Sequence, residues 1–161
     1  MLGIVCSTVL FRPSLVSSAQ ALNLIDSNSL RCLSKNIYFE ARNESTAGQL
    51  AVAQTVINRV RSIVFPDTVC EVVEQGPRHG NGVPKRDQCQ FSWYCDGRGD
   101  DPVKGKSWDK STKIATIVLL NRRWLFDIVD GATYYHANYV SPRWSRKKEK
   151  VVQIDSHIFY R

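Results

Sequence analysis

Apolar residues recur at helical spacing over the first third of the sequence. Intervals of three and four predict a first helix over about 30–43, with Ser27 or Ser29 as its N-cap, and a second helix over about 46–62. Each helix therefore carries one apolar face. The positions that define these faces are Leu30, Leu33, Ile37 and Ala41 in the first helix and Leu50, Ala53, Val56, Ile57 and Val60 in the second.

Two further helices are predicted from capping residues and spacing. Pro66 and Asp67 favour a short helix over 68–75, because proline fits a first helical turn and aspartate can cap it. Ser107 can cap a longer helix over about 108–127, whose apolar residues again have helical spacing. Helices are therefore expected on both sides of a long segment, 76–106, that is rich in Gly, Pro, Asp and Arg. A segment of this length without regular structure is usually functional, so we expect a substrate-facing loop there.

The pattern changes after Asp130 and Gly131, which form a predicted turn. Residues 132–137 and 151–161 are rich in β-branched and aromatic side chains, which indicates short strands. The sequence thus predicts an α+β domain that is mainly helical, with a small C-terminal β element.

Composition supports one folded domain of 161 residues. With 43% hydrophobic and 23% charged residues, the chain is typical neither of a disordered protein nor of a membrane bundle. No stretch approaches the roughly 18 uninterrupted apolar residues of a spanning helix. The formal net charge of +7 favours a polyanionic partner, and both nucleic acid and the acidic polymers of a bacterial envelope would fit.

The N-terminus resembles a signal sequence. A short apolar run is followed by small residues and the triplet Ala19, Gln20, Ala21, which predicts a signal peptide over 1–21 and a linker over 22–29. Because no Lys or Arg precedes the apolar run, an ordinary N-terminal tail is the alternative. The folded domain is expected over 30–161.

The cysteines also favour export. Cys6 would leave with the signal peptide, and an even set of four would remain, for which three disulfide connectivities are possible. Two disulfides fit an oxidising compartment. Buried free thiols and a zinc site are the alternatives, although the sequence contains no CxxC pair. The remaining cysteines are Cys32, Cys70, Cys89 and Cys95.

The densest polar cluster lies at the end of the first predicted helix, in YFEARNESTAGQ. Glu40 and Glu44 are four positions apart and share a helix face. Glu40 follows three apolar residues, so its pKa can be raised enough to keep it protonated, as a general acid requires. Glu44 lies among polar residues and should be more solvated. Two carboxylates in different environments are typical of glycosidic cleavage, but such pairs also occur on ordinary solvated helix faces.

Four segments in this order resemble the SleB-type cell wall hydrolase family, which includes spore-cortex-lytic enzymes and related hydrolases of bacteria and their phages. They are NIYFEARNESTAGQLAVAQTVINRV, FPDTVCEVV, CQFSWYCDG and GATYYHANYVSPRWSRKKEKVVQIDSHIFYR. The resemblance covers roughly residues 30–161. It implies cleavage of the glycan strands of peptidoglycan and a fold similar to the lysozyme-like lytic transglycosylases.

The resemblance also implies that Glu40 is the catalytic acid, since it matches the first glutamate of the family's EAR-x-E motif. Phe39 and Asn43 stand where the spore members have glycine. The implied reaction protonates the oxygen between N-acetylmuramic acid and N-acetylglucosamine. Attack by the C6 hydroxyl of the same sugar makes a lytic transglycosylase, whereas attack by water makes a muramidase. We favour the former, because an intramolecular nucleophile needs no second carboxylate to position water.

Substrate-binding residues are expected in the segment CQFSWYC, residues 89–95, which is called the island of the long loop. Gln90, Ser92 and Trp93 combine hydrogen-bonding groups with an aromatic surface, which suits a sugar ring and its hydroxyls. In the alternative interpretation, Phe91 and Trp93 belong to the core and only Gln90 and Ser92 face the groove.

Three more residues complete the candidate site. Tyr134 and His136 point to the same side of an alternating strand and are expected to line the cleft, although a strand histidine is often structural. Glu44 is a candidate contact to substrate, or it holds the active-site helix through Arg42 or a backbone amide. His157 is expected to support the fold.

The rival functions are nucleic-acid binding and a catalytically silent peptidoglycan-binding module. No recognition-helix, finger or RNP-like pattern is present, although Trp144 precedes the basic run SRKKEK, which is either a solvated turn or a surface attracted to the anionic wall. The sequence therefore predicts a monomeric peptidoglycan-cleaving enzyme without a metal or cofactor. We expect it to be exported to the periplasm or the exterior, or to serve as a phage lysis protein, without binding nucleic acid or inserting stably into a membrane.

Overall fold

The structure, a computed structural model, describes residues 25–161, so the expected signal peptide and Cys6 lie outside the described residues. This part of the chain confirms the mainly helical α+β class. Among these residues, no helix has the length and apolar character needed to cross a membrane. The helices are α2 (Ser27–Ala41), α3 (Thr46–Arg61), α4 (Val69–Val73) and α5 (Lys106–Asn121), with 3-10 helices η1 (Ser92–Cys95) and η2 (Arg143–Lys147), and the strands are β1 (Tyr134–Ala137), β2 (Lys150–Ile154) and β3 (His157–Tyr160).

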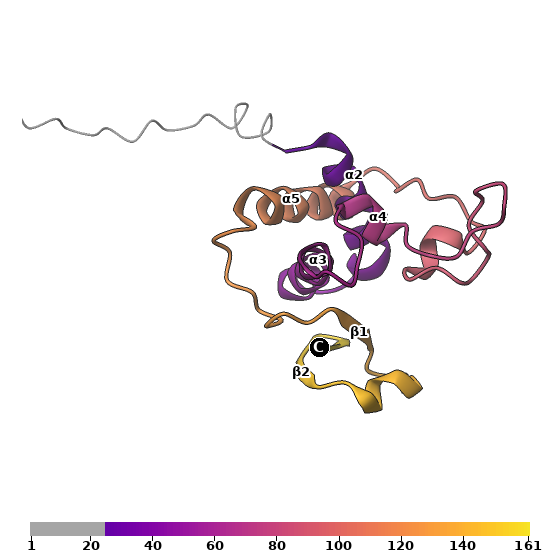
Figure 1. Cartoon of the computed structure of the whole chain (residues 1–161). Helices are drawn as coiled ribbons and strands as arrows, with labels where there is room; N and C mark the ends of the chain where they lie inside the picture. The colour runs from indigo at the N-terminus through magenta and orange to yellow at the C-terminus, as the bar shows by residue number, and fades with distance from the viewer. Residues whose placement is uncertain (1–24) are drawn as a thin grey trace, which may run out of the picture.

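Helix α3 lies at the centre of the domain, with α5 on one side and the sheet on the other (Figure 1). On the helical side, α2, α3, α4 and α5 share an apolar core with Phe91 and Trp93 of the long loop. On the sheet side, Val52 belongs to a second cluster with Val129 and Phe159. Because α3 is covered on both sides, several of its polar residues are buried as well. These are Gln49, Gln54, Thr55, Asn58 and Arg59.

Helix α2 begins earlier than the sequence pattern predicts. Asp26 is its N-cap, and the carboxylate accepts hydrogen bonds from the backbone N–H groups of Asn28 at 3.3 Å and Ser29 at 2.8 Å. A carboxylate offers two acceptor oxygens to the exposed N–H groups of a first turn, whereas a serine hydroxyl offers one. The prediction of Ser27 or Ser29 as the cap was therefore wrong, and the expected linker, 22–29, overlaps the first helical turn.

The starts of α4 and α5 also differ from the predicted ones. Thr68, rather than Asp67, caps α4 by accepting a hydrogen bond from the backbone of Glu71 at 3.2 Å. Helix α5 starts at Lys106 directly after Gly105, without a capping side chain, so Ser107 lies inside the helix and does not cap it. Local sequence located the starts of both helices to within two residues but did not identify their first hydrogen bonds.

Helix α5 ends at Asn121 rather than near residue 127. Beyond it, the chain turns toward α3, where the side chain of Gln54 donates to the carbonyl of Phe126 at 2.7 Å and accepts from the N–H of Ile128 at 3.0 Å. This long-range contact provides hydrogen-bond partners for backbone groups of the segment that replaces the last predicted turns of the helix.

The three strands form an antiparallel sheet in the order β1-β3-β2. The short strands predicted over 151–161 form a hairpin, in which β2 and β3 are joined by a turn at Asp155 and Ser156. In the register of β1 and β3, Tyr135 pairs with Phe159. Strand β1 is an edge strand, so one side of it is free of strand partners.

Two disulfides join the four cysteines of the described residues. Cys32–Cys70 ties α2 to α4, and Cys89–Cys95 closes the island of the long loop. The structure thus selects one of the three possible connectivities in place of free thiols or a zinc site. Gly76 allows the loop to pass closely, since a Cβ there would lie 3.0 Å from both the Cα and the Sγ of Cys89.

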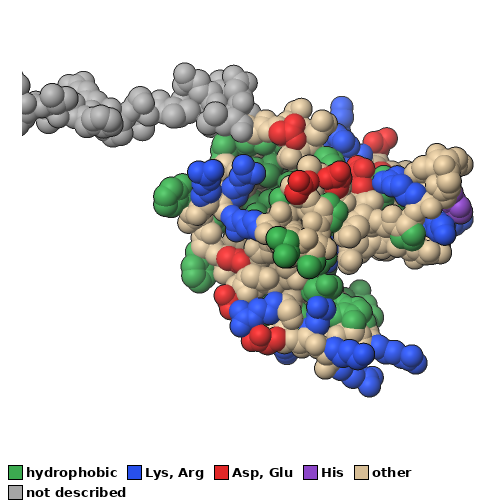
Figure 2. All heavy atoms as spheres, in the orientation of Figure 1, with side chains coloured by type: hydrophobic (Ala, Val, Ile, Leu, Met, Phe, Trp, Pro, Cys, Tyr) green, Lys and Arg blue, Asp and Glu red, His purple; other side chains and the backbone are tan. Residues whose placement is uncertain are grey.

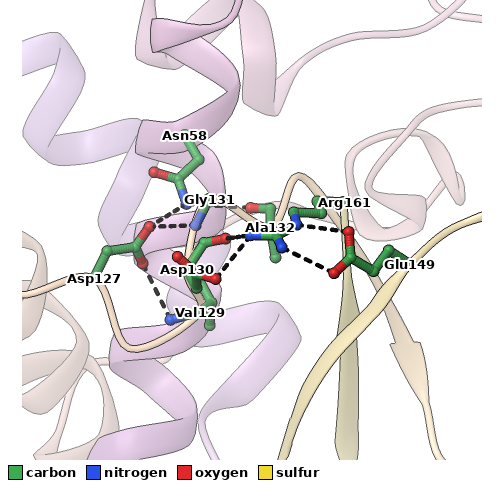
Figure 3. A network of polar contacts seen from close by, with 8 residues as sticks. All are labelled: Asn58, Asp127, Val129, Asp130, Gly131, Ala132, Glu149 and Arg161. Carbon is green, nitrogen blue, oxygen red and sulfur yellow. Dashed lines mark hydrogen bonds and ion pairs between the residues drawn. The ribbon is translucent and has the colours of Figure 1, made fainter.

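A polar network fastens the segment before β1 to α3 (Figure 3). Asp127 accepts a hydrogen bond from the side chain of Asn58 at 2.8 Å, and Asn58 also donates to the carbonyl of Ala132 at 3.2 Å. Beyond β3, Arg161 forms an ion pair with Glu149 at 2.8 Å. The start of the sheet is therefore held against the C-terminal half of α3.

Candidate active site

A cavity of about 360 Å³ opens where the end of α2, the long loop and the sheet meet. In Figure 2 the surface is indented between the 76–105 loop and the sheet. Four of the seven candidate site residues line the cavity: Glu40, Gln90, Ser92 and His136. The other three, Glu44, Trp93 and Tyr134, do not. Its walls are formed by Phe39, Glu40, Arg59, Gln90, Phe91, Ser92, Tyr135, His136, Ala137, Tyr139 and His157.

Glu40 lies in the last turn of α2, half-buried at the wall of the cavity. Its Oε2 accepts a hydrogen bond from the hydroxyl of Tyr135 at 3.0 Å. Burial raises the pKa of Glu40, while the hydrogen bond from Tyr135 and the positive charge of Arg59 act in the opposite direction. A carboxyl group in this setting keeps its proton to a higher pH than a solvated glutamate and can still release it, which suits a general acid.

Tyr135 is held firmly in place beside Glu40. Its ring meets that of His157 edge-on at 5.2 Å between centroids and lies 5.5 Å from that of Phe159. Burial raises the pKa of Tyr135 well above its ordinary value, so the residue remains a neutral hydroxyl that donates to Glu40. Its packing therefore fixes the direction of the carboxyl group.

Arg59 projects from α3 into the same region and is only 1% exposed. Its Nε donates to the carbonyl of Thr133 at 2.7 Å. The guanidinium carbon lies 5.1 Å from the ring centroid of Phe91, 5.3 Å from that of Phe65 and 5.9 Å from that of Tyr134. These contacts hold a positive charge close to the cavity wall.

The loop island contributes polar side chains to the cavity and aromatic side chains to the core. Gln90 and Ser92 are exposed at the cavity, whereas Phe91 is buried. Trp93 stacks on Phe39 with ring centroids 4.7 Å apart and donates from Nε1 to Asn36 at 3.2 Å. Trp93 thus packs away from the cavity, as in the alternative interpretation, whereas the buried Phe91 also forms part of the cavity wall.

Strand β1 turns a different tyrosine toward Glu40 than the one we expected. Tyr135 donates a hydrogen bond to Glu40, while Tyr134 packs on Phe65 and lies under the Nζ of Lys148, 3.5 Å from the ring centroid. His136 reaches the cavity wall, with its Nε2 2.9 Å from the hydroxyl of Tyr160. The sequence predicted that Tyr134 and Tyr135 point to opposite sides of the strand, but it did not show which of the two sides faces α2.

Glu44 lies at a separate junction between the α2–α3 turn and the β2–β3 hairpin. Its carboxylate accepts hydrogen bonds from the hydroxyl and the backbone N–H of Ser156. Nearby, Asp155 accepts from the N–H of Ser45 at 2.9 Å. The two elements come so close that a Cβ on Gly48 would lie 3.3 Å from the Cγ of Asp155. These contacts connect the turn after α2 to the sheet.

Sequence reasoning missed Arg59 and the contact from Tyr135. One signal for Arg59 was available, because it continues the spacing of Val52 and Val56 along the buried face of α3. A charged residue on such a face is unusual and needs a compensating environment. His157 was expected to support the fold, and it does pack on Tyr135, but it also lines the cavity.

Sequence comparisons relate the chain to enzymes of bacterial spores. A family model described as Cell Wall Hydrolase matches residues 43–160, a range that begins just after Glu40. The spore cortex-lytic enzyme of Oceanobacillus iheyensis is 28% identical over 133 residues, which are 82% of this chain and 41% of that protein. The spore cortex-lytic enzyme of Halalkalibacterium halodurans is also 28% identical over 133 residues, 34% of its length. The chain thus spans less than half of these curated relatives.

Two solved structures have a similar fold. The catalytic domain of the germination-specific lytic transglycosylase SleB from Bacillus anthracis matches with a TM-score of 0.65 and 26% identity, covering 86% of this chain and 98% of that domain. The catalytic domain of the Bacillus cereus SleB protein matches with a TM-score of 0.61 and 26% identity, covering 84% and 91%. The similarity therefore extends over nearly the whole of those catalytic domains.

Proposed function

Because the chain belongs to the cell wall hydrolase family, we propose that it cleaves the glycan strand of peptidoglycan between N-acetylmuramic acid and N-acetylglucosamine as a lytic transglycosylase. The observation that carries this proposal is Glu40 in its cavity. Among the described residues, it is the one carboxylate that lines this cavity, and burial raises its pKa. A single carboxyl group suits a reaction in which one residue serves first as acid and then as base.

The proposed reaction has two steps. Protonated Glu40 donates its proton to the glycosidic oxygen as the bond from that oxygen to C1 of the muramic sugar breaks, which leaves positive charge at C1. The C6 hydroxyl of the same sugar then bonds to C1 and gives its proton to the carboxylate of Glu40. The products are a 1,6-anhydromuramic end and a glucosamine end with a free 4-hydroxyl. Glu40 is protonated again, and no water is consumed.

The other cavity residues suit a sugar substrate. Gln90 and Ser92 of the long loop offer hydrogen bonds to a ligand, and His136 of β1 and the exposed Tyr139 also line the cavity. Outside the cavity, Lys and Arg side chains gather over η2 (Figure 2), and Arg143, Arg146 and Lys147 are exposed there. We propose that this basic surface attracts the anionic wall polymer at long range.

An exported location is part of the proposal. Two disulfides fit an oxidising compartment, and the substrate lies outside the cytoplasmic membrane. A periplasmic or extracellular enzyme, including a phage lysis protein, fits both observations.

Mass spectrometry of fragments released from purified peptidoglycan tests the reaction. Anhydro ends differ from reducing ends by the mass of one water, so the two products are distinguished directly. We expect anhydro ends from the wild type and from Glu44→Gln, and none from Glu40→Gln. The Glu44 variant is a matched control, because it makes the same chemical change four positions further along the chain.

The other outcomes point to other functions. Reducing muramic ends would identify a hydrolytic muramidase, in which water attacks C1. Binding of peptidoglycan without released fragments, by the wild type and Glu40→Gln alike, would indicate a binding module without catalysis. Undiminished anhydro ends from Glu40→Gln would move the acid to another residue.

A further inference from the structure

Arg59 is a buried cation whose partners do not account for its position. Its nitrogens form no ion pair with any carboxylate of residues 25–161. Nε is satisfied by Thr133, but Nη1 is buried without a hydrogen-bond partner in that part of the chain. Burying a charge is costly unless it is paired, and a buried N–H without an acceptor adds to the cost. Packing alone would be served better by an apolar residue such as methionine.

The surroundings of Arg59 hold its guanidinium group in one place. Phe65, Phe91 and Tyr134 surround it with aromatic rings, and the carbonyl of Thr133 fixes its Nε. That carbonyl is in turn fixed, because the preceding residue, Ala132, is bonded to Asn58 in the network of Figure 3. A charge held in this way cannot swing into solvent, so its field acts constantly on the cavity wall.

Glu40 is the acidic group of the cavity wall on which that field acts. The titratable groups that face Glu40 are Tyr135 from β1, Arg59 from α3 and, further around the wall, His136, His157 and Tyr139. Burial lowers the pKa of His157, which favours its neutral form. Among the described residues of this wall, Arg59 is therefore the one group with a permanent positive charge.

We propose that Arg59 is a positioning residue that stabilises the carboxylate form of Glu40 after its proton has passed to the glycosidic oxygen. The inference rests on the proposed function, in which Glu40 alternates between acid and base. Arg59 keeps its own protons throughout. Its role is to offset the cost of a negative charge on a half-buried carboxyl group, so that proton donation becomes easier.

The titration of Glu40, followed by carbon NMR of its side chain in the free protein, tests this coupling. In Arg59→Met the positive charge is lost, and the pKa of Glu40 should rise by about one pH unit. Arg59→Lys keeps the charge and should leave that pKa near its wild-type value. Arg61→Met is the matched control, since Arg61 lies on the same helix but is exposed and outside the cavity wall.

The pH dependence of cleavage gives a second readout. Activity requires protonated Glu40 and falls as the pH rises through its pKa. The alkaline limb of the profile should therefore move to higher pH in Arg59→Met and stay in place in Arg59→Lys and Arg61→Met. A purely structural role for Arg59 would lower activity at every pH without moving this limb.

An unchanged pKa of Glu40 in folded Arg59→Met would overturn the inference, and so would an equal rise in Arg61→Met. Should Arg59→Met fail to fold, Arg59→Gln removes the charge while keeping an N–H donor for Thr133. The titration of Glu40 in that variant then tests the inference in the same way. The two proposals fail differently. If the wild type releases no fragments, the enzymatic function fails but the titration still measures the coupling. If it releases anhydro ends and the titration is insensitive to Arg59, only this inference fails.

Discussion

Glu40 and Glu44 are separated by one helical turn of sequence, yet their carboxyl groups lie in contrasting environments. Glu40 faces a cavity, and one hydrogen bond, from Tyr135, reaches it from the described residues. Glu44 lies outside that cavity and accepts both the hydroxyl and the backbone N–H of Ser156. Helix α2 ends at Ala41, between the two residues, so they do not continue along one helix face.

This difference separates a carboxyl group suited to chemistry from one that stabilises the fold. A carboxylate has about four acceptor positions, and within residues 25–161 the hydroxyl of Tyr135 occupies one of those on Glu40. Because burial raises the pKa of Glu40, the charged form of this carboxyl group destabilises the folded protein. The bonds of Glu44, in contrast, join the turn after α2 to the sheet that carries Tyr135.

Glu40→Gln is expected to have the largest effect on activity. Glutamine has nearly the same shape but cannot donate the proton, so glycan cleavage should fall by at least about 100-fold. The melting temperature should stay the same or rise, because the raised pKa of Glu40 disfavours its charged form in the folded state above the unfolded pKa. Turbidity loss of peptidoglycan suspensions and calorimetry measure the two quantities.

A large loss of stability in Glu40→Gln would contradict the separation drawn between the two glutamates. Residual cleavage near the wild-type rate would contradict it as well, because the acid would then be another residue.

Glu44→Ala should show the opposite behaviour. It removes charge-assisted hydrogen bonds to Ser156 at a half-buried junction, so the free energy of unfolding should fall by about 2 kcal/mol. Cleavage per folded molecule should stay within about twofold of the wild type, since Glu44 lies outside the cavity wall. Urea unfolding curves and activity measured well below the transition check both values.

Glu71→Ala is a suitable control for this variant, because Glu71 is exposed and, within the described part of the chain, its side chain bonds to its own helix cap, Thr68. A selective loss of cleavage in folded Glu44→Ala would instead assign Glu44 to the substrate, as the sequence pattern allowed.

The contrast between the glutamates was only partly readable from the sequence. The apolar residues before Glu40 correctly indicated a less solvated carboxyl group. The partners of both glutamates come from the last 30 residues of the chain, Tyr135 for Glu40 and Ser156 for Glu44. No local pattern encodes such contacts, because they depend on how the sheet docks against α3.

The same distinction between local and long-range information holds for the fold. Helix α3 was predicted to within one residue at its end, since its periodicity and its cap, Ser45, are both local. The end of α5 was wrong because Gln54, distant in sequence, pairs with the backbone of the following segment. Strand alternation placed Tyr134 and Tyr135 on opposite sides but could not tell which side faces the helices.

Tyr135→Phe should have a smaller effect, which is a change in the pKa of Glu40. The variant removes the hydroxyl that donates to Glu40, a bond that favours the carboxylate form. The pKa of Glu40 should rise, and the alkaline limb of the cleavage profile should move up by about half a pH unit. Tyr134→Phe alters the neighbouring tyrosine, which lies outside the cavity wall, and should leave the limb in place. Equal shifts in both variants would exclude a specific contact.

Asp155→Asn should have the smallest effect, on the pH dependence of stability at the Glu44 junction. Hydrogen bonds from Ser45 lower the pKa of Asp155 in the folded protein. A lowered pKa contributes stability above the unfolded value of about 3.9, and this contribution is lost as the pH falls through the folded value. The wild-type melting temperature should therefore fall more steeply with acid than that of Asp155→Asn, while the alkaline limb of cleavage is the same in both proteins. A variant that shifted that limb would show that the junction and the cavity titrate together, and the two carboxylate environments would no longer be independent.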